Sequence, residues 1–403
     1  MAESRDARVD VAIFGGGVAG LWLLHRLRAA GFSALLLEAD RLGAGQTAAA
    51  QGIIHGGLKY ALDLRLTEAA RAIADMPDRW RACLAGAGEI DLRSVPVLAP
   101  RCHFWLPPGM LNRATGFFAS QAVRSKAERL KPADWPEALQ GQATVGAVYA
   151  LDEPVIDVPA LLATLAAPHQ DSIRRIDWAE GVAFEHDARG DPVAVRLGRA
   201  DGATVRLTAG CFVGTAGRGN EALLAHLPAM ASKTQRRRLH MAMLRGMRHR
   251  LYAHCFEASD KPRVTITSHA ASDGSVVWYL GGQLAEDGTR QSSTELLAKA
   301  RGEIATLLPG VDLADVQGAT LVVDRAEPRQ SFGRRPDRPV AAAAGRAIVA
   351  WPIKLAFAPA LAAEVMAHIA KAPIKPSAGD LAALADWPSP GLAPPPWEGA
   401  AWS

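Results

Sequence analysis

The stretch that decides the fold runs from Val9 to Gly20 and reads VDVAIFGGGVAG. Its first six residues are mostly apolar and rich in β-branched side chains, which is typical of a buried parallel strand. The glycines at Gly15, Gly17 and Gly20 then fit the pattern G-x-G-x-x-G. Residues 21 to 30 are amphipathic and predict a helix that ends at the next glycine. A strand, a glycine turn and a helix in this order predict a dinucleotide-binding unit.

Each of the three glycines has its own physical task in such a unit. Gly15 makes the turn from strand to helix, Gly17 lets the backbone approach a pyrophosphate, and Gly20 lets the helix pack closely on the strand. The helix N-terminus adds N–H groups and a partial positive charge, which favour phosphate. We therefore predict that these glycines bind the cofactor together with the first helical residues, Val18 and Ala19.

A second apolar run, residues 34 to 37, ends in Glu38, which lies eighteen residues after Gly20. A carboxylate at the end of this strand can accept hydrogen bonds from the ribose hydroxyls of an adenosine. We predict that Glu38 and its neighbour Ala39 contact the ADP part of the cofactor. Glycine turns alone are common, but two strands, a helix, three glycines and an acid in this order favour a dinucleotide site over an ordinary turn.

The composition fits an enzyme better than a nucleic-acid-binding protein. The chain has 403 residues, more than a single core usually holds, so two domains are expected. Hydrophobic residues make up 49%, charged residues 21%, and the net charge is only +4, which is ordinary for a globular protein. The basic cluster at residues 233 to 250 alternates in character from Arg238 to Met243, which indicates a strand with one buried face. We predict no nucleic-acid partner.

The expected location is the cytoplasm, with at most peripheral attachment to a membrane. The first residues, MAESRDAR, are polar and charged, so we expect no signal peptide. The apolar run at residues 347 to 370 is interrupted by prolines and charges, so we expect no transmembrane segment. The cysteines are scattered and are predicted to be buried thiols in a reducing compartment: Cys83, Cys102, Cys211 and Cys255.

Residues 45 to 60 read GQTAAAQGIIHGGLKY and form the second informative segment. It is too rich in small residues for an ordinary helix, but its isoleucines and Tyr60 argue against a solvated loop. The segment resembles the flavin-contacting segment of the D-amino-acid-oxidase-like superfamily of FAD oxidoreductases. Its His-Gly-Gly-x-x-Tyr part resembles FAD-dependent glycerol-3-phosphate dehydrogenases and L-2-hydroxyglutarate dehydrogenases. Lys59 stands where the former have arginine. The resemblance implies FAD as cofactor, with contacts at Gln46, Thr47, Gln51, Gly52 and Ile54.

Two later segments carry the same resemblance. Residues 211 to 217, CFVGTAG, resemble the superfamily's strand end beside the dinucleotide, which implies contacts at Ala216 and Gly217. We also place Val182, on one of the short strands before this segment, among the cofactor contacts. The third segment, Ile353 to Leu355, resembles a Gly-Gly-Lys-Leu-Thr-Thr segment of glycerol-3-phosphate dehydrogenases that runs by the pyrimidine edge of the flavin. It implies cofactor contacts at Pro352, Lys354 and Leu355.

The resemblance implies that flavin N5 accepts a hydride from a small anionic substrate, a 2-hydroxy acid or an alcohol like glycerol 3-phosphate. Cations should then converge over the flavin, and a lysine there would also favour the charge of the reduced ring. The alternative for any such cation is a structural ion pair or, for the lysine before the last helix, a side chain that reaches the surface. The candidates are Lys59, Arg325, Arg329 and Lys354.

An alcohol also needs a base for its hydroxyl proton, whereas a neutral amine has its own lone pair. His55 matches the histidine of the two hydroxy-acid families and is our first candidate, although it could instead pack against the flavin. Other available histidines are His240, His254 and His269. Two alternatives stay open: an amine or D-amino-acid oxidase or dehydrogenase of the same superfamily, and a non-catalytic FAD-binding protein. The electron acceptor is expected to be oxygen or a quinone.

We therefore predict an α/β fold in which a Rossmann-like FAD-binding domain is interleaved with a substrate domain built on a mainly antiparallel sheet. The FAD-binding domain takes residues 1–88, 147–229 and 331–372. The substrate domain takes residues 89–146 and 230–330. The Pro-rich tail, residues 373–403, is expected to be extended on the surface or on a partner subunit.

Overall fold

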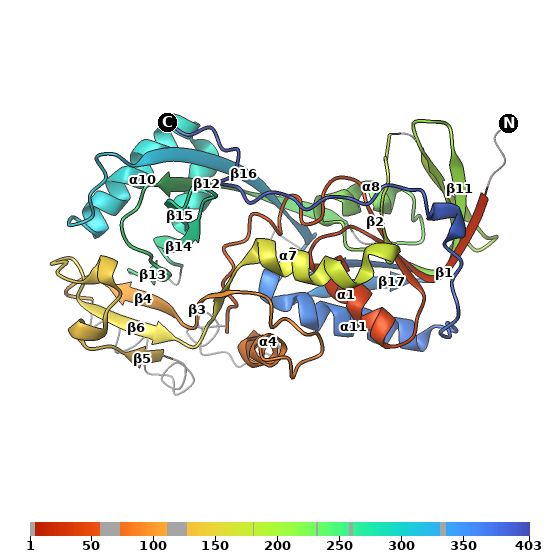
Figure 1. Cartoon of the computed structure of the whole chain (residues 1–403), viewed down its shortest axis with the longest axis horizontal. Coiled ribbons are helices and arrows are strands. Elements are labelled where there is room, and N and C mark those ends of the chain that lie inside the picture. Colours follow the sequence, from red (N-terminus) through yellow and green to blue (C-terminus); the bar gives the residue numbers. More distant parts are fainter. Residues whose placement is uncertain are drawn as a thin grey trace.

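Two large sheets organise the chain in the computed structural model, which describes residues 5–56, 73–110, 127–179, 181–230, 233–257, 261–330 and 336–403. They lie at opposite ends of an elongated molecule (Figure 1). The first sheet has the order β17-β18-β11-β1-β2-β8, and the second has the order β16-β12-β15-β14-β13-β4-β6-β5. The predicted fold class, with a parallel sheet and a mainly antiparallel one, is confirmed.

The first sheet is built around β1 (Arg5–Phe14), which is parallel to β11 (Thr204–Gly214) and to β2 (Ala34–Glu38). The sheet continues with β8 (Ile173–Arg175) beside β2 and β18 (Ala347–Trp351) beside β11, both parallel. Strands covered on both faces must be apolar throughout, and β1 is buried from Val9 to Phe14. The carboxyl ends of β1, β2 and β11 therefore lie together at one edge of the sheet.

Antiparallel strands extend this sheet on the side of β11 that faces away from β1. A hairpin of β9 (Val182–His186) and β10 (Pro192–Gly198) pairs with β11, and β17 (Val340–Ala344) pairs with β18. A short helix, α8 (Asn220–Ala225), follows β11.

Three helices pack together beside the first sheet: α1 (Val18–Ala29), α7 (Val158–Ala166) and α11 (Ala358–Lys371) (Figure 1). The helix predicted at residues 21–30 begins three residues earlier, directly after Gly17. A further helix, α4 (Met76–Leu84), fixes this layer. Its Trp80 ring lies 4.8 Å from that of Trp22, and its indole N–H donates to Ala356 O at 3.0 Å.

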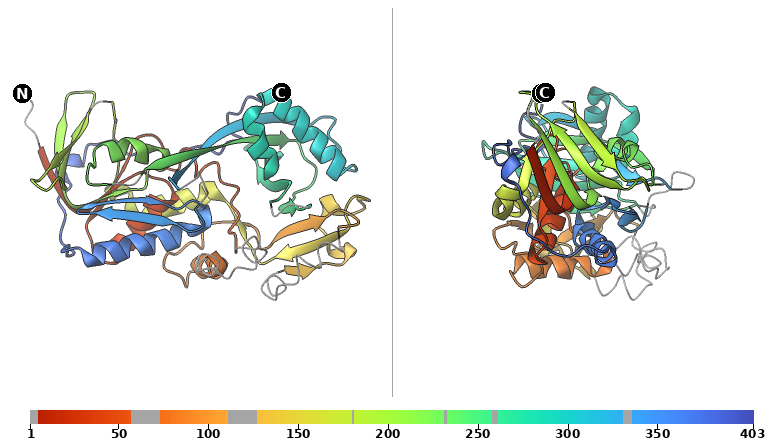
Figure 2. Two further views of the ribbon diagram at one scale, coloured as in Figure 1. Left: turned by 180° about the vertical axis from the view of Figure 1, so that it is seen from behind. Right: turned by 90° about the vertical axis from the view of Figure 1, so that its right-hand side faces the viewer.

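The second sheet contains two long antiparallel strands, β12 (Thr234–Arg245) and β16 (Gln317–Pro328). Figure 2 shows both running from the second sheet toward the first. Arg236 and Arg238 are exposed and pair with acids. The prediction of one buried face for residues 238–243 is wrong, because β12 is buried continuously from His240 to Leu244: Ala242 and Leu244 pack in one hydrophobic cluster, and Met241 and Met243 pack in another. The remaining strands of this sheet are β15 (Val276–Gly281), β14 (Val264–Ala270), β13 (Ala253–Cys255), β4 (Cys102–Leu106), β6 (Ala147–Leu151) and β5 (Ala127–Arg129).

Two helices accompany this sheet, α9 (Gln283–Asp287) and α10 (Ser293–Leu307). The predicted cap of α10 is present, because Ser292 and Glu295 form a capping box. A small two-stranded sheet is formed by β3 (Val97–Ala99) and β7 (Val155–Ile156). In the sequence, β3 comes just before β4 of the second sheet and β7 just after β6.

The strand β6 corrects one predicted domain boundary. A division at residue 147 would separate β6 from β4 and β5, with which it pairs. Alternation and turn signals locate a strand but do not name its partner, which long-range pairing decides. We retain the interleaved division as a proposal, with this boundary moved beyond Leu151.

The Pro-rich tail returns along the whole molecule. It pairs with β1 at Asp380, with residue 42 at Leu392, and with Gly318 of the second sheet at Ser403. All four cysteines are buried as free thiols. Within the described ranges, no helix is long and apolar enough to cross a membrane.

Candidate functional site

A cavity of about 530 Å³ lies at the carboxyl ends of β1, β2 and β11, the edge of a parallel sheet where ligands bind in such folds. Its volume is in the usual range for a ligand or cofactor site. Most of the predicted cofactor contacts line it, from segments far apart in the chain. They are Gly15, Gly17, Val18, Ala19, Glu38, Ala39, Gln46, Thr47, Ala216, Gly217, Pro352, Lys354 and Leu355.

Two glycines allow the turn between β1 and α1 to press against the end of β11. Gly15 has a φ of +107°, and a Cβ on it would lie 2.4 Å from the Cα of Ala216. A Cβ on Gly20 would lie 2.0 Å from the carbonyl oxygen of Gly15. Gly20 does not line the cavity, so in this structure its role is the close packing of α1 against the turn. No larger residue fits either position without moving the backbone.

The carboxylate of Glu38 is held at the wall of the cavity by two backbone amides. Its Oε2 accepts from the N–H of Gly16 at 2.5 Å, and its Oε1 accepts from the N–H of Asp40 at 2.8 Å. An ionised carboxylate has about four acceptor positions, so acceptor capacity remains for ribose hydroxyls. The arrangement fits the adenosine end of a dinucleotide.

The segment after Glu38 forms hydrogen bonds both to α1 beside the first sheet and to β16 of the second sheet. Thr47 Oγ1 accepts from the N–H of Val18 at 3.2 Å, at the first residue of α1. Gln46 Oε1 accepts from the N–H of Ala326 at 3.2 Å, so it joins the cavity wall to β16. Residues 321–324 and Ala326 of β16 line the cavity. The second sheet therefore forms part of its wall.

Besides Gly20, four predicted cofactor contacts do not line the cavity. Gln51 turns to the second sheet, where its amide donates to Tyr279 O at 2.8 Å. Gly52 packs on β7, since a Cβ there would lie 2.3 Å from Ile156 O. Ile54 and Val182 are buried in the core. A sequence resemblance locates the segment that passes a cofactor but does not say which of its residues face outward.

Lys354 lines the cavity and follows a strained backbone position. Ile353 has a φ of +55° and is the one non-glycine residue with positive φ among the described residues. The N–H of Lys354 donates to Pro352 O at 2.6 Å across it. A β-branched residue rarely adopts this conformation, and such strain concentrates at functional sites. The Lys354 Nζ lies 5.8 Å from the centre of the Phe357 ring, at the entry to α11.

The other candidate cations differ from the prediction. Arg325 is nearly buried, does not line the cavity, and has its Nη2 3.9 Å from Glu286 Oε1, which Arg237 also approaches. Arg329 is exposed beyond the end of β16 and likewise does not line the cavity. Here the alternative of a structural ion pair fits Arg325 better. Lys59 lies outside the described residues.

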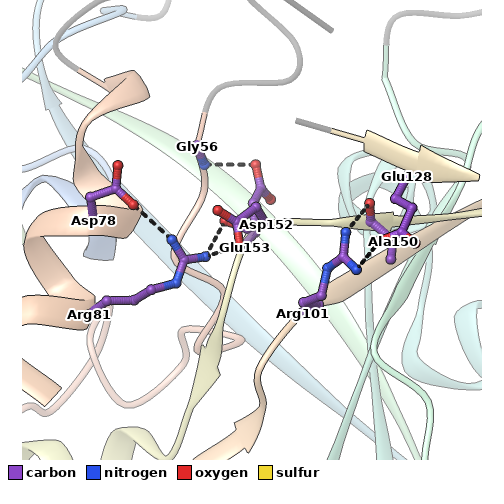
Figure 3. Close-up of polar contacts among 8 residues, drawn as sticks. All are labelled: Gly56, Asp78, Arg81, Arg101, Glu128, Ala150, Asp152 and Glu153. Atoms are coloured by element: carbon purple, nitrogen blue, oxygen red, sulfur yellow. Dashed lines mark hydrogen bonds and ion pairs between the residues drawn. The ribbon is translucent and has the colours of Figure 1, made fainter. Parts of the chain in front are cut away.

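His55 lies beside a buried carboxylate that the sequence analysis missed. Its Nδ1 is 3.2 Å from Glu153 Oε2, and Glu153 Oε1 accepts from the N–H of Gly56 at 2.7 Å. Figure 3 shows Glu153 directed at the amide of Gly56. His254 completes the cluster, with its ring centre 5.8 Å from that of His55 and its Nδ1 2.8 Å from Thr265 Oγ1. Glu153 is 98 residues from His55, and no spacing in the sequence links them.

The charge state of this cluster follows from its burial. Desolvation by burial raises the pKa of Glu153, but the hydrogen bond and charge of His55, the charge of His254 and the Gly56 amide outweigh it, so the pKa lies below its usual value. Burial lowers the pKa of His254 to about 4. At neutral pH His254 is therefore neutral, and we attribute the ionised state of Glu153 chiefly to His55 and Gly56.

Two other histidines that the sequence offered lie in the second sheet. His240 Nδ1 is 3.1 Å from Gly288 O, and His269 stacks on Trp397 with ring centres 4.2 Å apart. Neither lines the cavity. The tail that carries Trp397 does, through Ala393, Pro394 and Pro396. A Pro-rich composition predicts an extended segment but not the surface against which it lies.

The glycine turn, the Glu38 carboxylate and the cavity between both sheets define a dinucleotide-binding protein. The chain belongs to the family of FAD dependent oxidoreductases, whose model matches residues 10–352. The cofactor is FAD, as predicted, and FAD accepts electrons from substrate when bound.

Among individual proteins, the chain is 47% identical over 391 residues to the probable FAD-dependent oxidoreductase PA4991 of Pseudomonas aeruginosa, covering 96% of this chain and 97% of that one. The crystal structure of PA4991 covers 99% of both chains with a TM-score of 0.83 and 41% identity.

More distant structures share the fold. Glycine oxidase from Geobacillus kaustophilus has a TM-score of 0.61 and 18% identity over 93% of this chain and 97% of that one. L-α-glycerophosphate oxidase from Mycoplasma pneumoniae, solved with FAD bound, has a TM-score of 0.61 and 14% identity over 92% and 97%. One of these relatives is named for an amine substrate and the other for an alcohol, so they show the architecture and not the substrate.

Proposed function

We propose that the protein oxidises a small anionic alcohol, a 2-hydroxy acid or a compound like glycerol 3-phosphate, by transfer of a hydride to FAD. The observation that carries the proposal is the pairing of His55 with the buried Glu153, since an alcohol needs a base and an amine does not. Lys354 at the cavity supplies the cation for the substrate anion. These roles are proposals: Lys354 lines the cavity, whereas His55 and Glu153 are not among its lining residues, so the role of His55 rests also on the resemblance of its segment to the hydroxy-acid families.

In this account the residues of the chain divide the work. The turn from Gly15 to Ala19 and the Glu38 carboxylate bind the ADP part of the cofactor. Lys354 orients the substrate anion, and His55 takes the hydroxyl proton as the carbon loses its hydride and the carbonyl forms. The atoms balance, because the alcohol gives one proton to His55 and one hydride to the cofactor.

The test is anaerobic bleaching of the bound flavin by a panel of 2-hydroxy acids, glycerol 3-phosphate and amino acids. The proposal predicts bleaching by at least one anionic alcohol and none by the amino acid of the same carbon skeleton. Bleaching by amino acids alone would establish the alternative, an amine oxidase or dehydrogenase. A holoprotein that no compound bleaches, although dithionite does, would favour a non-catalytic FAD-binding protein.

For reoxidation we retain oxygen and a quinone as the two candidate acceptors. Mixing the reduced protein with air-saturated buffer, and separately with a soluble quinone, separates them by rate. The cytoplasmic location also stays a prediction. Recovery of the protein in a membrane fraction that resists high salt would contradict it, because electrostatic peripheral attachment is screened by salt.

A further inference from the structure

Both oxygens of the buried Glu153 carboxylate lie within hydrogen-bond distance of nitrogen atoms of one short segment, residues 55–56. Oε1 accepts from the Gly56 amide at 2.7 Å, and Oε2 lies 3.2 Å from the Nδ1 of His55. Because an ionised carboxylate can only accept, this geometry requires that Nδ1 of His55 carries a hydrogen. In a neutral imidazole the other nitrogen, Nε2, is then the acceptor.

The acidic neighbour of Glu153 has a different partner. Asp152 is exposed and pairs with Arg81, which also binds Asp78. Figure 3 shows the Arg81 guanidinium directed at these two acids, while Glu153 points to Gly56. Adjacent acids thus have separate tasks, and the chain itself supplies a control for the loss of one negative charge.

We propose that Glu153 is a positioning residue that holds His55 in the Nδ1–H tautomer, so that Nε2 is the nitrogen free to accept a proton from substrate. For a neutral His55 the tautomer follows from its contact with the ionised Glu153, and only the consequence for the rate rests on the proposed function. The same residues could be arranged around a metal, because ligand atoms of His55, Glu153 and His254 lie within 4.8 Å of one another. The proton-holding arrangement is favoured, since both Glu153 oxygens already have N–H partners.

The informative variant is Glu153→Gln. An amide has one oxygen and one NH₂ group, so it cannot accept from Gly56 and His55 at once. If its oxygen keeps the Gly56 amide, its NH₂ faces Nδ1 of His55, which must then become the acceptor. The tautomer of His55 is thereby reversed, and its Nε2 carries the hydrogen.

The experiment measures the imidazole nitrogen signals of ¹⁵N-labelled holoprotein by NMR, with His55 assigned by comparison with His55→Gln. We expect the Nδ1–H form in the parent and in Asp152→Asn, and the Nε2–H form in Glu153→Gln. A parent in the Nε2–H form overturns the proposal without any variant. So does a Glu153→Gln protein that binds FAD and keeps the parental tautomer.

Two further readouts separate this proposal from its competitors. Addition of ZnCl₂ should leave the His55 signals unchanged; a stoichiometric shift at micromolar zinc that Glu153→Gln abolishes would make the cluster a metal site. With an alcohol that bleaches the parent, Glu153→Gln should reduce flavin at least 10²-fold more slowly, as general bases contribute about that much, while Asp152→Asn stays near the parent. If no alcohol bleaches the parent, the proposed function fails, but the tautomer measurement still decides the role of Glu153.

Discussion

The carboxylate of Glu38 accepts a 2.5 Å hydrogen bond from the backbone amide of Gly16, across the turn that joins β1 to α1. The bond ties the residue that ends the second strand to the glycines that follow the first. Both groups therefore face the same end of the cavity. This hydrogen bond therefore places the carboxylate and the phosphate-binding turn where both can contact the same cofactor.

Replacing this carboxylate should weaken FAD binding. Glu38→Ala removes the acceptor for the ribose and one support of the glycine turn, and hydrogen bonds to charged groups are worth about 1.5–3 kcal/mol each. We expect the dissociation constant of FAD to rise at least about tenfold, measured by flavin fluorescence on dilution. Glu128→Ala is the control, since it removes an exposed acid of β5 that pairs with Arg101. Parental FAD retention in Glu38→Ala would contradict the assignment of the adenosine end.

The Pro-rich tail, residues 373–403, should also contribute to FAD binding, because part of it lines the cavity. Trp397 is 4% exposed and stacks on His269, which anchors the tail segment that lines the cavity. Trp397→Ala should therefore remove the contact that holds the tail segment against the cavity, and the rate of FAD dissociation should increase. Trp402→Ala is the matched control, because Trp402 lies further along the tail, under Arg245. Equal FAD dissociation rates in the two variants would show that the tail is not part of the site.

The dinucleotide-binding unit could be predicted from the sequence because its parts are close together along the chain. The dinucleotide unit needs a strand, a glycine turn and a helix in sequence, and Gly15, Gly17 and Glu38 occupy the places that this order predicts. Lys354 could be found by resemblance. Glu153 could not, because its partner is 98 residues away. The side-chain directions of Gln51 and Arg325 also depend on contacts with the second sheet and α9, which no local pattern encodes.

Two buried histidines should make the protein sensitive to mild acid. Burial lowers the pKa of His254 to about 4 and that of His269 to about 3. Their unfolded value is about 6.5, so between these values the unfolded chain binds more protons and stability falls as pH decreases. The effect amounts to about 3 kcal/mol for His254 at pH values below its folded pKa. Urea unfolding from pH 7 to pH 4.5 should show it.

The matched variant for this prediction is His269→Phe, which keeps a ring to stack on Trp397 but cannot take up a proton. Its free energy of unfolding should depend on pH less steeply than that of the parent, by about one proton in the window from pH 6.5 to pH 4.5. A parental slope in His269→Phe would show that His269 is not a neutral buried group. Protonation of Glu153 should reduce stability only below about pH 4.5, because its pKa in the folded protein lies below the usual value of 4.5.

The central claim is that Lys354, placed at the cavity after the strained Ile353, serves the substrate anion and not the retention of FAD. Lys354→Met keeps the aliphatic stem and removes only the charge. FAD should stay bound, because the residues proposed to bind its ADP part lie between Gly15 and Glu38. Lys371→Met, at the far end of α11, is the control for loss of a lysine charge from the same region.

The most direct measurement is the anaerobic stopped-flow rate of flavin reduction by the anionic alcohol that bleaches the parent. We predict that Lys354→Met retains FAD and reduces it about 10²-fold more slowly, as expected for the loss of one preorganised electrostatic contact, while Lys371→Met reduces it at the parental rate. Reduction of the Lys354→Met flavin at the parental rate would contradict the account, and Lys354 would then be a lysine that only reaches solvent beside α11.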